Sequence, residues 1–196
     1  MVIGNKTSVW ANLGASSHSD KEREKHDYYA TDPLSITLLH RHGLLDKSSI
    51  YWESSCGGGN MSKELQRLGY TVLSSDKYDH GYGVTGFDFF DSTGYWDGNI
   101  ITNPPYNVIN DYIVHALEVC LGKVYIFGRI QTLETVARYN RIFRDTPPSM
   151  VCPFVKRIPC YRSDESKQSK GSAVCYAWFI WDNQDDDNEC RIKWLI

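Results

Sequence analysis

Short apolar runs alternate with segments of helical spacing along the first three quarters of the chain. The apolar runs that predict strands are 49–53, 70–76, 99–102 and 123–127, with a weaker strand or extended loop over 84–90. Apolar residues recur at helical spacing in 33–42, 61–68, 108–121 and 132–143. This strand–helix alternation predicts a doubly wound, mostly parallel α/β sheet.

Capping residues mark two helix starts. Asp32 precedes Pro33, which suits an N-cap followed by proline at the first helical position, and Asn60 is the expected cap of the helix that begins at Met61. Gly69 follows that second helix as a stop signal.

The pattern changes after Pro147-Pro148. Residues 150–154 and 173–181 are rich in β-forming residues, and they bracket a polar loop over 161–172. A final apolar run covers 191–196. The α/β sheet is therefore expected to end in a C-terminal antiparallel hairpin.

Composition changes this picture little. The 196 residues are 41% hydrophobic and 23% charged, with a formal net charge of −3, which is typical of a globular protein. No apolar run is long enough to span a membrane, and the N-terminus lacks the apolar region of a secretory signal. We expect a polar segment over 1–27, one domain over 28–196, and no contact with a membrane.

The six cysteines indicate the compartment. None forms a C-x-x-C pair, and the spacings are wide and irregular, so no zinc site is predicted. Free cysteines inside apolar runs favour a reducing, cytoplasmic location.

The most informative stretch is 99–106, where an apolar strand ends abruptly in Asn103-Pro104-Pro105-Tyr106. Neither proline can continue a ladder, and the residue before a proline is pushed into extended geometry. Asn103 is thus expected at the carboxyl tip of a parallel strand, where α/β sheets bind ligands. An amide, a freed carbonyl and an aromatic face could hold a flat base there. The alternative is a plain strand exit, with Asn103 capping the next helix.

A glycine turn follows the first strand, which ends in Glu53 and continues to Gly57-x-Gly59. Glycines let the backbone approach a ligand closely, but the strand-end carboxylate disfavours a phosphate. A ligand with a positive amine or sulfonium, such as S-adenosylmethionine, fits better. Asp76 then ends the second strand at close to the ~20-residue spacing of a ribose-binding acid. A tight turn and an exposed strand-end aspartate are the alternatives.

Phe87-Asp88-Phe89 lies in the next connection. An acid flanked by aromatic rings could bond an adenine amine while a ring packs against the base. Taken alone, two core phenylalanines around an exposed acid are the better interpretation.

These motifs, in this order, resemble the S-adenosylmethionine-dependent amino-methyltransferases, and most closely the phage-type DNA N6-adenine methyltransferases. Tyr29-Ala30-Thr31-Asp32-Pro33 is similar to the N-terminal cofactor motif of that family, with Asp32 inserted. The run 177–181 is similar to its last hairpin. The resemblance covers about residues 28–196 and implies the Rossmann-like methyltransferase fold, in the cytoplasm of a host cell if the chain is phage-encoded.

The resemblance also assigns roles. The residues expected to bind S-adenosylmethionine are Tyr29, Thr31, Glu53, Gly57, Gly59, Asp76, Asp88 and Phe89. The residues expected to act on the amine are Asn103, Pro104, Pro105 and Tyr106. The side-chain carbonyl of Asn103 and the backbone carbonyl of Pro104 would accept the amine hydrogens, and Tyr106 would stack on the base. No metal is required.

The substrate is expected to be DNA, whose target base must leave the stack. A surplus of positive charge in 156–170 could meet phosphates, and an aromatic residue there could stack on a base. The candidates for this contact are Arg129, Lys156, Arg157, Tyr161, Arg162, Lys167 and Lys170. The alternative is a solvated loop. The chain has no room for a separate recognition domain, so loops, a partner or a second subunit in a homodimer would supply specificity.

Two other functions remain open. The Asn-Pro-Pro-Tyr motif is shared by methyltransferases for RNA bases and for protein glutamine amides. A non-catalytic nucleotide-binding protein on the same fold is the rival from another class, although a degenerate copy would be free to lose the motif.

Overall fold

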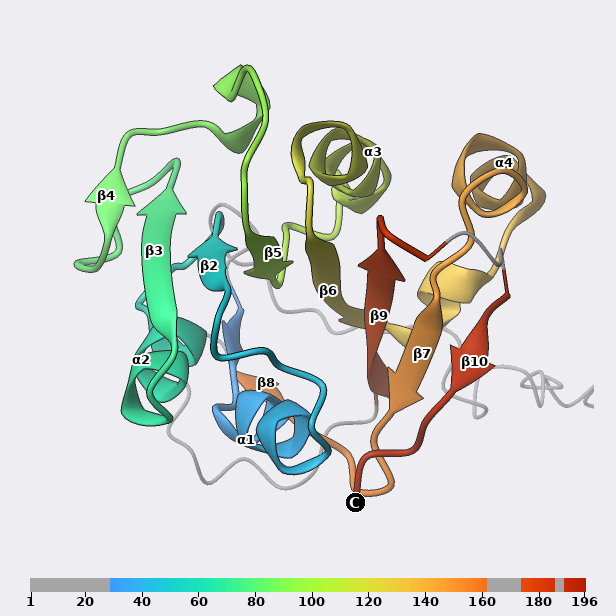
Figure 1. Cartoon of the computed structure of the whole chain (residues 1–196), viewed down its shortest axis with the longest axis horizontal. Helices are drawn as coiled ribbons and strands as arrows, with labels where there is room; N and C mark the ends of the chain where they lie inside the picture. Colours follow the sequence, from blue (N-terminus) through green and yellow to red (C-terminus); the bar gives the residue numbers. More distant parts are fainter. Residues whose placement is uncertain (1–28, 162–173, 186–188) are drawn as a thin grey trace, which may run out of the picture.

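The computed structural model describes residues 29–161, 174–185 and 189–196. Among them, eight strands form one sheet in the order β10-β7-β9-β6-β5-β2-β3-β4, shown in Figure 1. The bounds are β2 Ile50–Glu53, β3 Thr71–Asp76, β4 Val84–Thr85, β5 Asn99–Thr102, β6 Lys123–Arg129, β7 Met150–Pro153, β9 Tyr176–Asp182 and β10 Arg191–Ile192. Only β9 runs antiparallel to its neighbours in this described sheet.

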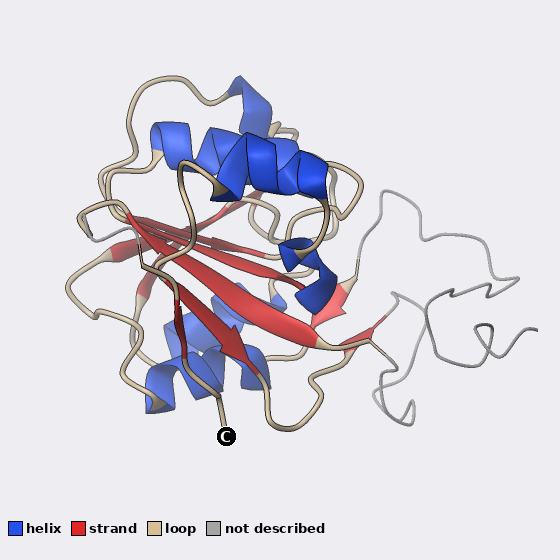
Figure 2. Cartoon of the chain, turned by 90° about the vertical axis from the view of Figure 1, so that its right-hand side faces the viewer, coloured by secondary structure: helices blue, strands red, loops and turns tan. Residues whose placement is uncertain are grey.

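Helices cover both faces of the sheet (Figure 2). The main helices are α1 Leu34–Arg41, α2 Asn60–Arg67 and α3 Ile109–Val119. Side chains of α1 and α2 pack with one buried cluster, and those of α3 pack with the other. The doubly wound, mostly parallel sheet with its antiparallel β7–β9 pair is therefore confirmed.

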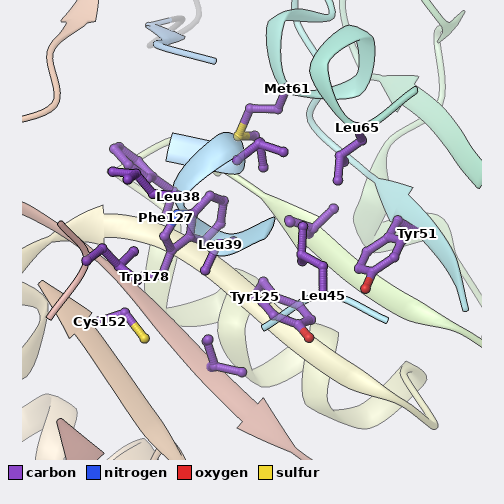
Figure 3. Packing of buried hydrophobic residues seen from close by; sticks show 14 of the residues in the cluster. Leu38, Leu39, Leu45, Tyr51, Met61, Leu65, Tyr125, Phe127, Cys152 and Trp178 are labelled. Atoms are coloured by element: carbon purple, nitrogen blue, oxygen red, sulfur yellow. The ribbon is translucent and has the colours of Figure 1, made fainter. Parts of the chain in front are cut away.

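Alternation along the strands divides the core into these two layers. Tyr51 and Trp52 are neighbours on β2, yet they belong to opposite clusters. Figure 3 shows the first layer, in which Leu39 of α1 and Trp178 of β9 are fully buried. Each such side chain stabilises the fold by about 1.5–3 kcal/mol. Trp178 also donates its indole N–H to the Ser35 carbonyl, at 3.2 Å.

A second, two-stranded sheet was not predicted. β1, Ala30–Thr31, pairs antiparallel with β8, Cys160–Tyr161. Two-residue strands carry no periodic signal, so the sequence could not indicate this pairing. It brings the segment before α1 next to the start of the polar loop.

Several predicted elements need correction. The expected helix over 132–143 is three short pieces: 3₁₀-helix Ile130–Leu133, α4 Val136–Arg138 and π-helix Tyr139–Phe143. Thr135 interrupts it with φ 88°. Extended structure over 84–90 is limited to β4, and a 3₁₀-helix covers Phe89–Asp91. The last strand ends at Ile192, although Leu195 bridges to Phe154.

The predicted caps are also displaced. The N-cap of α2 is Gly59 in a left-handed conformation, and Asn60 is the first helical residue. The carboxylate of Asp32 does accept the Leu34 N–H at 2.9 Å, but α1 begins one residue later than expected. The polar segment 1–27 lies outside the described residues, so the domain division stays a prediction.

Candidate active site

A cavity of ≈ 440 Å³ opens at the carboxyl ends of β2, β3 and β5. These three strands are parallel neighbours, so their terminal side chains meet at one edge of the sheet. Eight of the residues predicted for the site line it: Tyr29, Thr31, Glu53, Asp76, Asp88, Phe89, Asn103 and Pro105. The carboxylate that ends β2 and the amide that follows β5 thus share one cavity.

The glycine turn shapes this cavity without lining it. Gly57 and Gly59 adopt φ 51° and 77°, which L side chains rarely tolerate. The Gly57 N–H donates to Oδ2 of Asp76 at 2.8 Å, which ties the turn to the end of β3. Ser54, Ser55 and Cys56, just before the glycines, form the wall instead.

Glu53 is 2% exposed at the end of β2. Its Oε2 accepts the backbone N–H of Ser62 at 2.8 Å and also the Ser62 hydroxyl. Burial raises the pKa of Glu53 from 4.5 to about 8, against the opposing effect of these two hydrogen bonds. A cation bound in the cavity would favour the ionised carboxylate.

Asp76 and Asp88 follow along the same edge. The second oxygen of Asp76 accepts the Tyr78 N–H at 2.8 Å, so backbone donors orient both of its oxygens. Asp88 lies 2.6 Å from Lys77 Nζ. Its hydrogen bond with Lys77 holds the pKa of Asp88 below its usual value.

Phe89 is a buried wall of the cavity. The residue is 3% exposed, and its ring stacks on that of Tyr112 with centroids 4.3 Å apart. The ring of Phe90, the next residue, is exposed and also lines the cavity. The Phe87-Asp88-Phe89 motif therefore combines a core ring with a cavity-lining acid.

The side chain of Asn103 is held by Thr31 of β1 and by Tyr29, the residue before β1. Its Nδ2 donates to the Thr31 hydroxyl at 2.9 Å and lies 3.3 Å from the Tyr29 carbonyl. Its Oδ1 is buried and has no hydrogen-bond partner. Buried acceptors are rarely left unpaired, so this oxygen is a candidate acceptor for a donor group of a ligand.

Tyr106 lies behind the cavity wall. Its ring is nearly parallel to that of Tyr29, with centroids 6.1 Å apart, and the Arg129 guanidinium lies 4.8 Å from its centroid. Burial raises the pKa of Tyr106 well above its usual value, so the phenol stays protonated. Pro104, which precedes Pro105, is buried and is not among the lining residues.

The other predicted substrate contacts are dispersed. Lys156 and Arg157 are exposed on the segment before β8. The backbone of Tyr161 pairs with Ala30, beside the cavity-lining residues of β1. Arg162, Lys167 and Lys170 lie outside the described residues.

Sequence reasoning missed much of the lining. The missed residues are Ala30, Ser54, Ser55, Cys56, Asn60, Met61, Lys77, Tyr78, His80, Phe90, Asn107, Val108 and Tyr112. Five of them, Ser54, Ser55, Cys56, Lys77 and Tyr78, directly follow the ends of two predicted strands, which was an available signal. Tyr112 carries no such signal, because its position on α3 predicts only a core residue.

Two further findings apply only to the described ranges 29–161, 174–185 and 189–196. They contain no group of His, Cys, Asp and Glu suited to a metal ion. None of their helices has the length and hydropathy needed to cross a bilayer.

Comparison with known proteins yields structural similarity alone. No family model and no curated sequence matches the chain. A type I restriction-modification methyltransferase subunit from Streptococcus thermophilus superposes with TM-score 0.59 and 10% identity, over 86% of this chain and 48% of that one. A corresponding modification subunit of a putative type I restriction enzyme from Vibrio vulnificus gives 0.52 and 9%, over 94% and 49%. This chain spans about half of each subunit.

A putative RNA methyltransferase from Pyrococcus horikoshii gives TM-score 0.54 and 14% identity, over 76% of this chain and 81% of that one. Proteins described as methyltransferases with different substrates thus resemble this chain in fold. The chain has the Rossmann-like methyltransferase fold.

Proposed function

We propose that this chain transfers a methyl group from S-adenosylmethionine to the exocyclic N6 amine of adenine in DNA. The observation that carries the proposal is the unpaired, buried Oδ1 of Asn103 beside the cavity. An unmet buried acceptor costs about 1–3 kcal/mol. A substrate amine that donates to this oxygen would remove that cost.

The cavity suits the proposed cofactor. Its volume of ≈ 440 Å³ falls in the range of about 300–1,000 Å³ typical of small-molecule sites. Glu53, Asp76 and Asp88 give it three carboxylates, which favour a ligand with cationic groups and hydroxyl or amine donors. Glu53 would face the cationic methionine end, Asp76 the ribose hydroxyls, and Asp88 the adenine.

The residues around Asn103 would activate the amine. An exocyclic amine is a poor nucleophile because its lone pair is delocalised into the ring. Acceptance of its hydrogens by Asn103 Oδ1, and by the Pro104 carbonyl in the role that the sequence resemblance implies, would free the lone pair and stabilise the positive charge that develops. When bound, S-adenosylmethionine would supply an electrophilic methyl group to the nitrogen, with its neutral thioether as the leaving group. The amine proton then passes to water.

Aromatic rings near Asn103 and cations elsewhere on the surface support a nucleic-acid base over a protein amide. The Tyr29 ring lines the cavity and is backed by the nearly parallel ring of Tyr106, and a lining aromatic ring can stack on a planar base. The cations Arg129, Lys156 and Arg157 could contact phosphates. Two of the similar structures are modification subunits of restriction systems, which supports DNA as the substrate, and a third is a putative RNA methyltransferase, so RNA is tested beside DNA.

A methyl-transfer assay tests the proposal. The full chain is incubated with S-adenosylmethionine labelled in the methyl group and with duplex DNA, tRNA or a protein mixture in parallel. We expect label in DNA, recovered as N6-methyladenine after digestion to nucleosides. Label in tRNA or protein would show that the same chemistry acts on another substrate. Label in none of the three would contradict the proposed methyl transfer.

A further inference from the structure

The short strand β1 and the residue that precedes it supply the two acceptors that hold the Asn103 amide. The Thr31 hydroxyl lies 2.9 Å from Nδ2, and the Tyr29 carbonyl lies 3.3 Å from the same atom. A backbone carbonyl can only accept, so the atom facing it must be the amide nitrogen. With these two contacts, Nδ2 of the amide faces Tyr29 and Thr31, and Oδ1 lies on the other side.

Thr31 provides the shorter of the two contacts and is itself well fixed. It is 3% exposed and pairs with Cys160 across the β1–β8 ladder. Its hydroxyl is also a hydrogen-bond partner of the Cys160 thiol. The position of the hydroxyl is therefore set by the second sheet, independently of any ligand.

An asparagine amide that is not held can rotate by half a turn and exchange its oxygen for its nitrogen. In the rotated state, Nδ2 would point at the substrate amine as a second donor. Catalytic groups must keep their productive orientation through contacts made by their neighbours. The Tyr29 carbonyl, which can only accept, selects the state in which Nδ2 faces β1, and the shorter bond to the Thr31 hydroxyl holds the amide in that state.

We propose that Thr31 is a positioning residue: its hydroxyl accepts from Nδ2 and, together with the Tyr29 carbonyl, holds the Asn103 amide so that Oδ1, and not Nδ2, faces the acceptor amine. This inference rests on the proposed function. It also assigns Thr31 a different role from the cofactor contact that the sequence resemblance implies. The two roles differ in what they do to cofactor affinity.

Thr31→Val keeps the shape and the strand preference of the residue and removes the hydroxyl. We expect kcat for methyl transfer to fall about 10- to 100-fold, the equivalent of one hydrogen bond to a buried group. The Kd for S-adenosylmethionine, measured by calorimetry, should change less than about twofold, since the lost bond is to Asn103. Thr31→Ser should restore most of kcat. Thr71→Val, the same change at an exposed strand position, is the matched control.

Three outcomes would overturn the inference. The first is an unchanged kcat in Thr31→Val. The second is a loss of cofactor affinity as large as the loss of kcat, which would make Thr31 a cofactor-binding residue. The third is a Thr31→Ser variant as slow as Thr31→Val.

A spectroscopic measurement separates this inference from the proposed function. The side-chain N–H signals of Asn103 are identified in the NMR spectrum of the ¹⁵N-labelled chain by their absence in Asn103→Asp. In Thr31→Val, their exchange with solvent should be at least about tenfold faster than in the wild type. Unchanged exchange would overturn the inference even if a methyl acceptor is found. Failure of the wild type to methylate any acceptor would contradict only the proposed function.

Discussion

Replacing Glu53 with glutamine should flatten the pH dependence of the stability of the protein. Glu53 is buried, and burial raises its pKa from 4.5 to about 8 in the folded chain. Because the folded pKa lies above the unfolded value, the folded state binds the proton more tightly. The resulting stabilisation is fully present below pH 4.5 and is lost as pH rises to about 8.

The magnitude follows from this shift. Each pH unit within the window costs about 1.4 kcal/mol of unfolding free energy, and the whole window costs roughly 5 kcal/mol. Glutamine has no proton to lose and keeps an oxygen for the Ser62 N–H and hydroxyl. The Glu53→Gln variant should therefore lack this slope and become more stable than the wild type as pH approaches 8.

Urea unfolding at intervals between pH 4.5 and 8 measures this difference. Glu134→Gln, a change at an exposed glutamate, is the control and should follow the wild type. Equal slopes in Glu53→Gln and the wild type would refute the reasoning, because Glu53 would then be ionised in the folded, ligand-free state.

Two further variants probe the cavity edge. A Cβ at Gly59 would lie 2.2 Å from the Tyr82 ring, whereas one at Gly43 would meet nothing within 4 Å, and both residues have positive φ. Gly59→Ala should thus lower the unfolding free energy by at least about 1 kcal/mol more than Gly43→Ala. Equal losses of stability in urea unfolding would contradict this steric explanation. Asp76→Asn should weaken S-adenosylmethionine binding about tenfold or more, measured by calorimetry, because a charged hydrogen-bond partner is lost. An unchanged affinity would exclude the proposed ribose contact.

The strands that form the cavity were predictable because each ends its apolar run in a polar residue. Glu53, Asp76 and Asn103 mark the ends of β2, β3 and β5, and parallel strands bring such ends to one edge. The single cavity that contains all three residues agrees with that expectation.

The elements that were missed depend on contacts between distant segments. β1 and β8 have two residues each and exist through their mutual pairing. Thr135 interrupts a helical pattern with a positive φ that no glycine or asparagine marks. The unpaired state of Asn103 Oδ1 also depends on β1, so the sequence could indicate the amide but not its orientation.

The central claim is that Asn103 Oδ1 accepts a hydrogen of the substrate amine. Its most direct test is the rate of methyl transfer from saturating S-adenosylmethionine to duplex DNA by the Asn103→Ala variant. Asn140→Ala, at an exposed position, is the control. We expect the rate to fall at least about a hundredfold while the Kd for S-adenosylmethionine stays within about threefold of the wild type. Turnover at the wild-type rate would contradict the claim.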